Sequence, residues 1–91
     1  MLKFALVGCG RISVRHAQLL GEGIIADTQL VAVCDAAFDR AEATGAKYDV
    51  PAFADMHEMM ESAQPDVVVV LTESGYHARH VIELARHGKH I

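Results

Sequence analysis

Three stretches of the chain are almost continuously apolar, instead of alternating between apolar and polar residues. They are Leu2–Val7, residues 30–34 and residues 67–71. Continuous apolar runs are typical of parallel strands that are buried on both faces of a sheet. A shorter run at residues 50–53 predicts a fourth strand, and residues 89–91 predict the beginning of a fifth.

Segments with helical periodicity lie between these runs, because their apolar residues recur at intervals of three and four. One segment follows Asp55, and Glu58 three residues later completes a capping-box-like start. Gly21 and Gly88 are stop signals behind two others. A fourth segment predicts a poorer helix, because Gly45 interrupts it. The predicted helices span residues 12–20, 36–48, 56–63 and 78–85.

The resulting order, βαβαβαβαβ, predicts one α/β domain over residues 1–91. Parallel strands joined by right-handed helical crossovers form an open, doubly wound sheet of the Rossmann type. We expect the chain to end in or just after the fifth strand of this sheet. Such sheets bind ligands outside the carboxyl ends of their strands, where the strand order reverses. That point lies between the first strand and the strand at 67–71, so loops 8–13 and 72–77 are expected to meet a ligand.

The first of these loops has the sequence GCGRIS, which is nearly the G-x-G-x-x-G turn that carries the pyrophosphate of a dinucleotide. The first glycine permits a tight turn, the second lets the backbone approach the pyrophosphate, and the following helix start offers free N–H groups. Ser13 stands in place of the third glycine or alanine; that position serves helix packing, so we expect serine to be tolerated. The turn predicts cofactor contacts from Gly8, Cys9, Gly10, Arg11 and Ile12.

Asp35 ends the second strand, 25 residues after Gly10. A carboxylate at this place accepts hydrogen bonds from the adenosine ribose hydroxyls and repels a 2′-phosphate, which favours NAD over NADP as the cofactor. The same carboxylate can also cap a helix that begins at Ala36. Arg40 is a weaker candidate for a 2′-phosphate partner, because it lies more than a turn into the predicted helix.

The second loop is polar and directly follows a buried strand. Thr72 and Ser74 can donate or accept hydrogen bonds there, and Glu73 can accept them from ribose hydroxyls. His77 lies near the helix start and faces the predicted cleft. These four residues are therefore candidates for contacts with the nicotinamide half of the cofactor, although the same residue types are also ordinary in turns.

Composition narrows the class of protein. The chain has 91 residues, of which 52% are hydrophobic, and a formal net charge of −4. Scattered basic residues and a negative net charge argue against a nucleic-acid partner. The longest apolar run is far too short to cross a bilayer, and no basic-then-apolar leader is visible, so we expect no membrane partner and a cytoplasmic protein.

The cysteines and histidines predict neither a disulfide nor a metal site. Cys9 and Cys34 do not form a disulfide framework and fit a reducing compartment. Histidines recur at intervals of three, but no cluster of cysteines or carboxylates accompanies them. The pairs in question are His77 with His80 and His87 with His90.

Four stretches of this chain resemble the N-terminal domain of the Gfo/Idh/MocA oxidoreductases, the family of glucose–fructose oxidoreductase and inositol dehydrogenase. Many members carry proline where this chain has Glu73. The TESG segment, together with MHEMM, resembles a narrower branch that oxidises nucleotide-linked amino sugars, such as UDP-N-acetylglucosaminuronate, at C3. The four stretches are FALVGCGRIS, LVAVCD, DMHEMM and PDVVVVLTESGYHARHVIELARHGKHI, and they cover the chain almost end to end.

The resemblance implies an NAD-dependent oxidoreductase that transfers a hydride between a hydroxyl carbon of a sugar or nucleotide sugar and nicotinamide. In the family, a catalytic lysine and a substrate-binding C-terminal domain follow the segment that ends here at Ile91. We therefore expect a cofactor-binding domain without catalytic residues, inactive alone and self-associating through an exposed sheet edge. The alternative is a Rossmann-like nucleotide-binding regulatory module without hydride chemistry.

Overall fold

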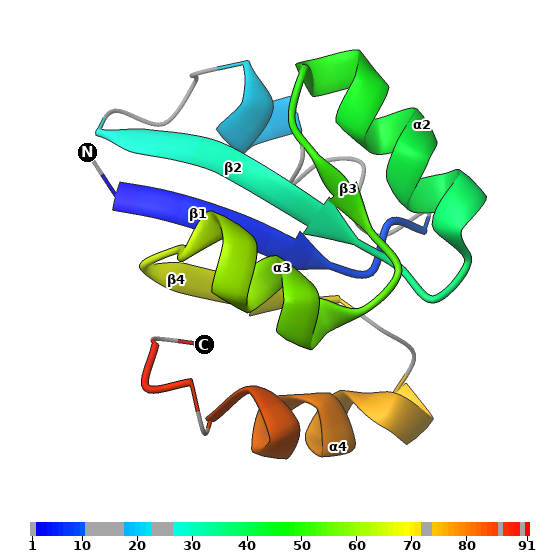
Figure 1. Cartoon of the computed structure of the whole chain (residues 1–91), viewed down its shortest axis with the longest axis vertical. Coiled ribbons are helices and arrows are strands. Elements are labelled where there is room, and N and C mark those ends of the chain that lie inside the picture. The colour runs from blue at the N-terminus through cyan, green and yellow to red at the C-terminus, as the bar shows by residue number, and fades with distance from the viewer. Residues whose placement is uncertain (1, 11–17, 23–26, 72–73, 86, 90) are drawn as a thin grey trace.

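The computed structural model describes residues 2–10, 18–22, 27–71, 74–85, 87–89 and 91. Within them, four parallel strands form one sheet in the order β3-β2-β1-β4 (Figure 1). The strands are β1 (Leu2–Val7), β2 (Thr28–Cys34), β3 (Ala52–Phe53) and β4 (Val67–Val70). The helices are α2 (Phe38–Tyr48), α3 (Met56–Ala63) and α4 (Ser74–Ala85), and residues 18–21 are helical as well.

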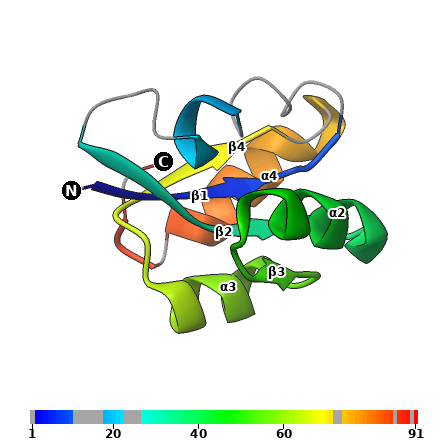
Figure 2. The same ribbon diagram turned by 90° about the horizontal axis from the view of Figure 1, so that it is seen from above.

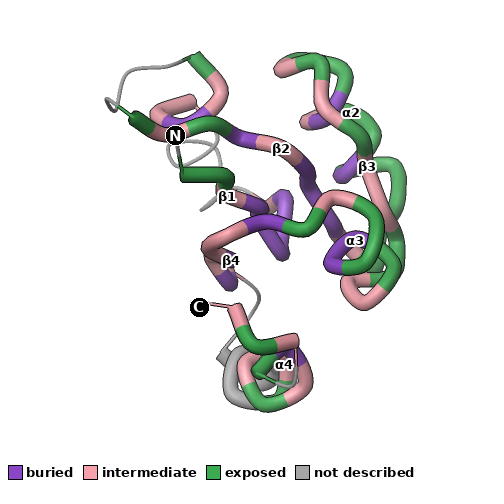
Figure 3. Tube along the Cα trace, turned by 60° about the vertical axis from the view of Figure 1, so that its left-hand side comes forward, coloured by how far each residue is buried: buried purple, intermediate pink, exposed green. Residues whose placement is uncertain are grey.

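Helices cover both faces of the sheet (Figures 1 and 2), as the continuous apolar runs predict. On one face, Met59 and Met60 of α3 and Leu84 of α4 are buried against the strands. On the other face, Leu20 and Ala41 of α2 are buried in a second cluster. Burial is concentrated along the strands, whereas α2 is exposed over most of its length (Figure 3). The doubly wound α/β fold is therefore confirmed.

The predicted start of α3 is confirmed at Asp55. Asp55 is the N-cap residue, and its carboxylate accepts a hydrogen bond from the His57 N–H at 2.9 Å. Two other helices start elsewhere than predicted. α2 begins at residue 38 instead of 36, and α4 begins at residue 74, four residues before its first periodic apolar residue, Ala78. The first turn of α4 is polar, so apolar periodicity cannot reveal it.

Gly45 does not interrupt α2, and that prediction is wrong. The helix runs without a break from Phe38 to Tyr48. Gly45 is buried, and a Cβ atom built on it would lie 2.6 Å from the carbonyl oxygen of Val50. The glycine therefore allows α2 to lie close to the segment that leads into β3.

The C-terminal residues differ from the prediction of a fifth strand. Gly88, with φ of 70°, follows the end of α4, and neither Lys89 nor Ile91 belongs to a strand. His90 lies outside the described residues.

Candidate cofactor-binding site

The strand order reverses at β1, which pairs with β2 on one side and with β4 on the other. All three strands are parallel, so their carboxyl ends meet at one edge of the sheet. The glycine turn follows β1, Asp35 follows β2, and Leu71 follows β4. The structure thus has the predicted switch point, between β1 and β4, and the described candidates Gly8, Cys9, Gly10 and Asp35 lie at this edge.

Gly8 shapes the turn after β1. Its φ is 104°, a left-handed value that favours glycine. Its N–H donates to the Cys34 carbonyl at 2.7 Å, and on the other side of β1 the Leu71 N–H donates to the Val7 carbonyl at 2.8 Å. Both neighbouring strands therefore hold the backbone at the point where it turns.

The Asp35 carboxylate joins the glycine turn to the loop before α2. Its Oδ2 accepts a hydrogen bond from the Cys9 N–H at 2.8 Å, and its Oδ1 accepts one from the Ala37 N–H at 2.9 Å. An ionised carboxylate can accept about four hydrogen bonds, so about two positions remain for ribose hydroxyls. The structure thus brings Asp35 together with Gly8, Cys9 and Gly10.

The capping role proposed for Asp35 takes a different form. The N-cap residue of α2 is Ala37, and no side chain caps it. The bond from Asp35 to the Ala37 N–H closes a turn that precedes the helix. This turn delays the helix by two residues relative to the prediction.

The delayed start of α2 changes the position of Arg40. Arg40 lies in the first turn, and its N–H donates to the Ala37 carbonyl at 3.0 Å. A Cβ atom built on Gly10 would lie 3.7 Å from Nη1 of Arg40. The prediction that Arg40 lies more than a turn into the helix is therefore wrong, and its guanidinium lies beside the second glycine of the turn. The sequence signal for this position of Arg40 is Asp35 itself, because an aspartate that forms a turn delays the start of the helix.

Cys9 contributes its backbone rather than a reactive thiol. Its side chain is buried, and the thiol donates to the Cys34 carbonyl at 3.6 Å. Burial, with a smaller effect from the Asp35 charge, raises the pKa of Cys9 to about 11. Burial likewise raises the pKa of Cys34 to about 12. Both thiols stay protonated at neutral pH, so neither is a nucleophile there.

The structure describes the remaining candidate residues only in part. Arg11, Ile12, Thr72 and Glu73 lie outside the described residues. Ser74 and His77 belong to the first turn of α4, where the structure describes the backbone. In the described part of the chain, no three His, Cys, Asp or Glu side chains are grouped as metal ligands would be. None of the helices described has the length and apolar character to cross a bilayer.

Comparison with known proteins supports the interpretation of this chain as a cofactor-binding domain. Residues 2–91 match the family model described as "Oxidoreductase family, NAD-binding Rossmann fold". The myo-inositol 2-dehydrogenase of Thermotoga maritima is 33% identical over 91 residues, which are 99% of this chain and 27% of that protein. The D-glucoside 3-dehydrogenase of Escherichia coli is 30% identical over 99% of this chain and 26% of its own length.

Solved structures agree. The WlbA dehydrogenase from Bordetella pertussis, solved in complex with NADH and UDP-GlcNAcA, superimposes with a TM-score of 0.86 and is 32% identical over 97% of this chain. The match covers 27% of that chain, so this sequence spans about a quarter of the length of such relatives. The fold, the glycine turn with its carboxylate and the family match together show that the chain belongs to the Gfo/Idh/MocA oxidoreductase family, as its N-terminal NAD-binding Rossmann domain.

Proposed function

We propose that this chain is the cofactor domain of a larger dehydrogenase and binds NAD at the carboxyl edge of β1, β2 and β4. The observation that carries the proposal is the glycine turn with Gly8 at φ of 104° and the Cys9 N–H held by Asp35 at 2.8 Å. This arrangement fits a pyrophosphate over the turn and a ribose at the carboxylate. The bound cofactor would supply the hydride acceptor, and the protein would orient it.

Three described residues would each contact a different group in the adenosine half of the cofactor. Gly10 leaves room for the pyrophosphate, because it has no Cβ. Asp35 would accept the ribose hydroxyls and repel a 2′-phosphate, which favours NAD over NADP. Arg40 lies beside Gly10, where its positive charge would attract the phosphates of either cofactor.

We infer that the larger protein oxidises a hydroxyl carbon of a sugar or nucleotide sugar. Support comes from the relatives, which include an inositol dehydrogenase, a glucoside dehydrogenase and a dehydrogenase solved with UDP-GlcNAcA. The TESG and MHEMM segments favour the nucleotide-sugar branch. Catalytic residues are expected in the part of such proteins that this chain does not span.

Calorimetric titration with NAD and with NADP tests the proposal. We expect NAD to bind more tightly, and Gly10→Val to weaken NAD binding by about tenfold or more, since a larger side chain would occupy the place of the pyrophosphate. A Cβ atom at position 10 would lie 3.7 Å from the nearest described atom, Nη1 of Arg40, which is an ordinary van der Waals distance. Unchanged NAD affinity in a folded Gly10→Val variant would rule out the turn as the pyrophosphate site.

A second variant, Asp35→Asn, tests the preference for NAD over NADP. Asp35→Asn removes the charge that repels a 2′-phosphate but keeps one carbonyl oxygen as an acceptor. We expect the ratio of NADP to NAD affinity to rise by about tenfold in Asp35→Asn. An unchanged ratio would show that Asp35 only supports the turn.

A further inference from the structure

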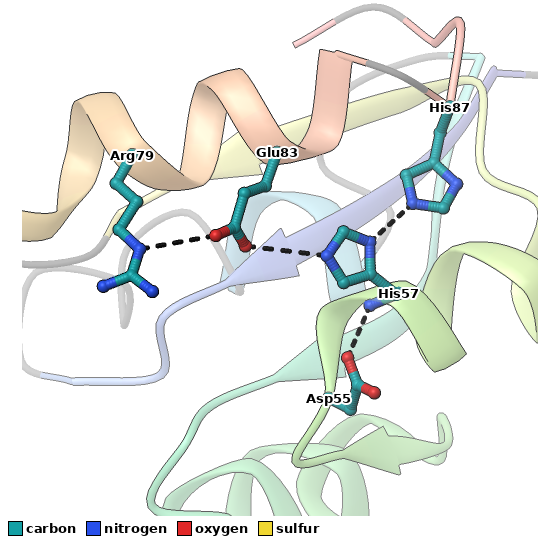
Figure 4. Close-up of polar contacts among 5 residues, drawn as sticks. All are labelled: Asp55, His57, Arg79, Glu83 and His87. Atoms are coloured by element: carbon teal, nitrogen blue, oxygen red, sulfur yellow. Dashed lines mark hydrogen bonds and ion pairs between the residues drawn. The ribbon is translucent and has the colours of Figure 1, made fainter.

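A pair of histidines joins α3 to the turn after α4, on the sheet face opposite α2 (Figure 4). Nδ1 of His57 lies 2.8 Å from Nε2 of His87. The ring centroids lie 5.0 Å apart with the planes inclined by 30°, so the two nitrogens lie close to the line that joins the rings. This head-on contact is the geometry of a shared proton. Ligands of one metal ion would instead point towards a common third position.

The backbones that carry both rings are anchored. His57 is the second residue of α3, and the Asp55 carboxylate holds its N–H. The His87 N–H donates to the carbonyl of Leu84 at 3.0 Å, and Leu84 is fully buried in the core. The contact between the rings is therefore fixed at both ends, and a change in it acts on the packing of α4 against α3.

Among the described residues, the carboxylate of Glu83 contacts the pair. Oε2 of Glu83 lies 3.5 Å from Nε2 of His57, and Oε1 of the same carboxylate lies 3.3 Å from Nε of Arg79 (Figure 4). Desolvation acts to raise the pKa of Glu83, but Arg79 and His57 outweigh it and lower that pKa below its usual value. Glu83 thus stays ionised in mild acid.

The charge balance allows one imidazolium but opposes two. Glu83 can compensate one positive charge on the pair, and it already interacts with Arg79. Asp55 is committed to the helix cap. The strands packed against the two helices are β2, β3 and β4, and none of them carries an acidic or basic residue.

We propose that His57 and His87 form a proton-operated latch between α3 and α4. The latch is closed while at least one of the two imidazoles is neutral, because one nitrogen can then accept the hydrogen bond. When both rings are protonated, neither can accept, the two positive charges repel, and the latch opens. Opening takes up one proton from solvent. This device lies beyond the proposed function, since it involves no cofactor.

The sign of the pH effect follows from proton uptake. The unfolded chain holds a proton on both histidines below about pH 6.5, whereas the closed pair, by its definition, holds at most one. The unfolded state then binds more protons, so the free energy of unfolding falls as the pH falls below that value. One proton corresponds to an increase in the unfolding constant of about tenfold per pH unit.

Urea unfolding of the 91-residue chain between neutral pH and mild acid tests the latch. Glutamine in His87→Gln can still bond to His57 but carries no second charge. We expect the acid dependence of the unfolding constant in His87→Gln to be weaker than in the parent by up to about tenfold per pH unit. Lys89→Gln, in the segment after α4 but outside the pair, is the control: it removes a charge that does not titrate in mild acid, and it should keep the parental dependence. Equal dependence in the parent and His87→Gln would overturn the proposal.

A second measurement does not depend on unfolding. In ¹⁵N-labelled chain, we expect a scalar coupling between the two ring nitrogens across the hydrogen bond at neutral pH, and its loss as the second ring protonates. A coupling that persists with both rings protonated would contradict the latch, as would its absence at neutral pH. Tight Zn²⁺ binding that His87→Gln abolishes would replace the latch with a metal site.

Discussion

The guanidinium of Arg40 and the carboxylate of Asp35 flank the glycine turn with opposite charges. Asp35 is committed to two backbone N–H groups of the protein itself. Arg40 is exposed, and its Nη1 lies beside Gly10. Under the proposed function the two residues would act on different parts of a dinucleotide, Asp35 on ribose hydroxyls and Arg40 on phosphate charge.

We predict that Arg40→Gln weakens NAD binding by about 3- to 10-fold, because a charge-assisted contact with phosphate is lost. Lys47→Gln is the control: it removes the same charge from the last turn of the same helix, where the Lys47 ammonium lies over the Tyr48 ring. Calorimetric titrations at low and high salt measure both variants. An equal loss in the two would mean that Arg40 acts only through net charge.

The buried thiols predict loss of stability in alkali. The pKa values of Cys9 and Cys34 are raised to about 11 and about 12 in the folded chain. Unfolded thiols ionise near pH 8.5, so the stabilising contribution is complete below that pH and is lost as the pH rises towards the folded values. Urea unfolding from pH 8 upwards should show this decline. A Cys9→Ala, Cys34→Ala double variant should lack it, and an identical decline in that variant would assign it to other groups.

Among the elements, α2 depends on a close approach at one position. In most exposed helices, replacing glycine by alanine stabilises by about 1 kcal/mol. At Gly45 we predict the opposite sign, a destabilisation of about 1–3 kcal/mol, since the new Cβ would meet the Val50 carbonyl at 2.6 Å. Urea unfolding of the parent and of Gly45→Ala measures this change in the free energy of unfolding. Ala46→Gly, at the exposed neighbouring position, should cost about 1 kcal/mol or less, and stabilisation by Gly45→Ala would show that the approach is not tight.

The sequence predicts the elements better than their contacts. Strands are recognisable because burial on both faces leaves continuous apolar runs, and α3 because Asp55 caps it. The start of α2 is not recognisable from the sequence, because a turn at Asp35 competes with the helix. The turn motif predicts Gly8, Gly10 and Asp35 as cofactor contacts, and the structure joins Asp35 to the glycine turn through the Cys9 N–H. The position of Arg40 beside Gly10 and the pairing of His57 with His87 depend on how separate elements pack, and no local pattern encodes that.

At the scale of the whole molecule, apolar surface remains exposed. Ile82 on α4 is 73% exposed, and Leu2 and Ile91 are 50% and 45% exposed. We predict that the 91-residue chain self-associates, because exposed apolar side chains and sheet edges favour pairing between chains. Sedimentation velocity at low and high protein concentration measures this. Ile82→Gln should shift the equilibrium towards monomer, and a parent chain that stays monomeric at high concentration would refute the prediction.

The two hydrogen bonds of Asp35 have a consequence for the thermodynamics of cofactor capture. A carboxylate held by two backbone N–H groups has already lost its rotational freedom on folding. A ribose that docks on it then immobilises no side chain at this point, which avoids roughly 0.5–1.5 kcal/mol of ordering entropy. Folding has ordered this carboxylate, so under the proposed function cofactor association need not wait for Asp35 to rearrange.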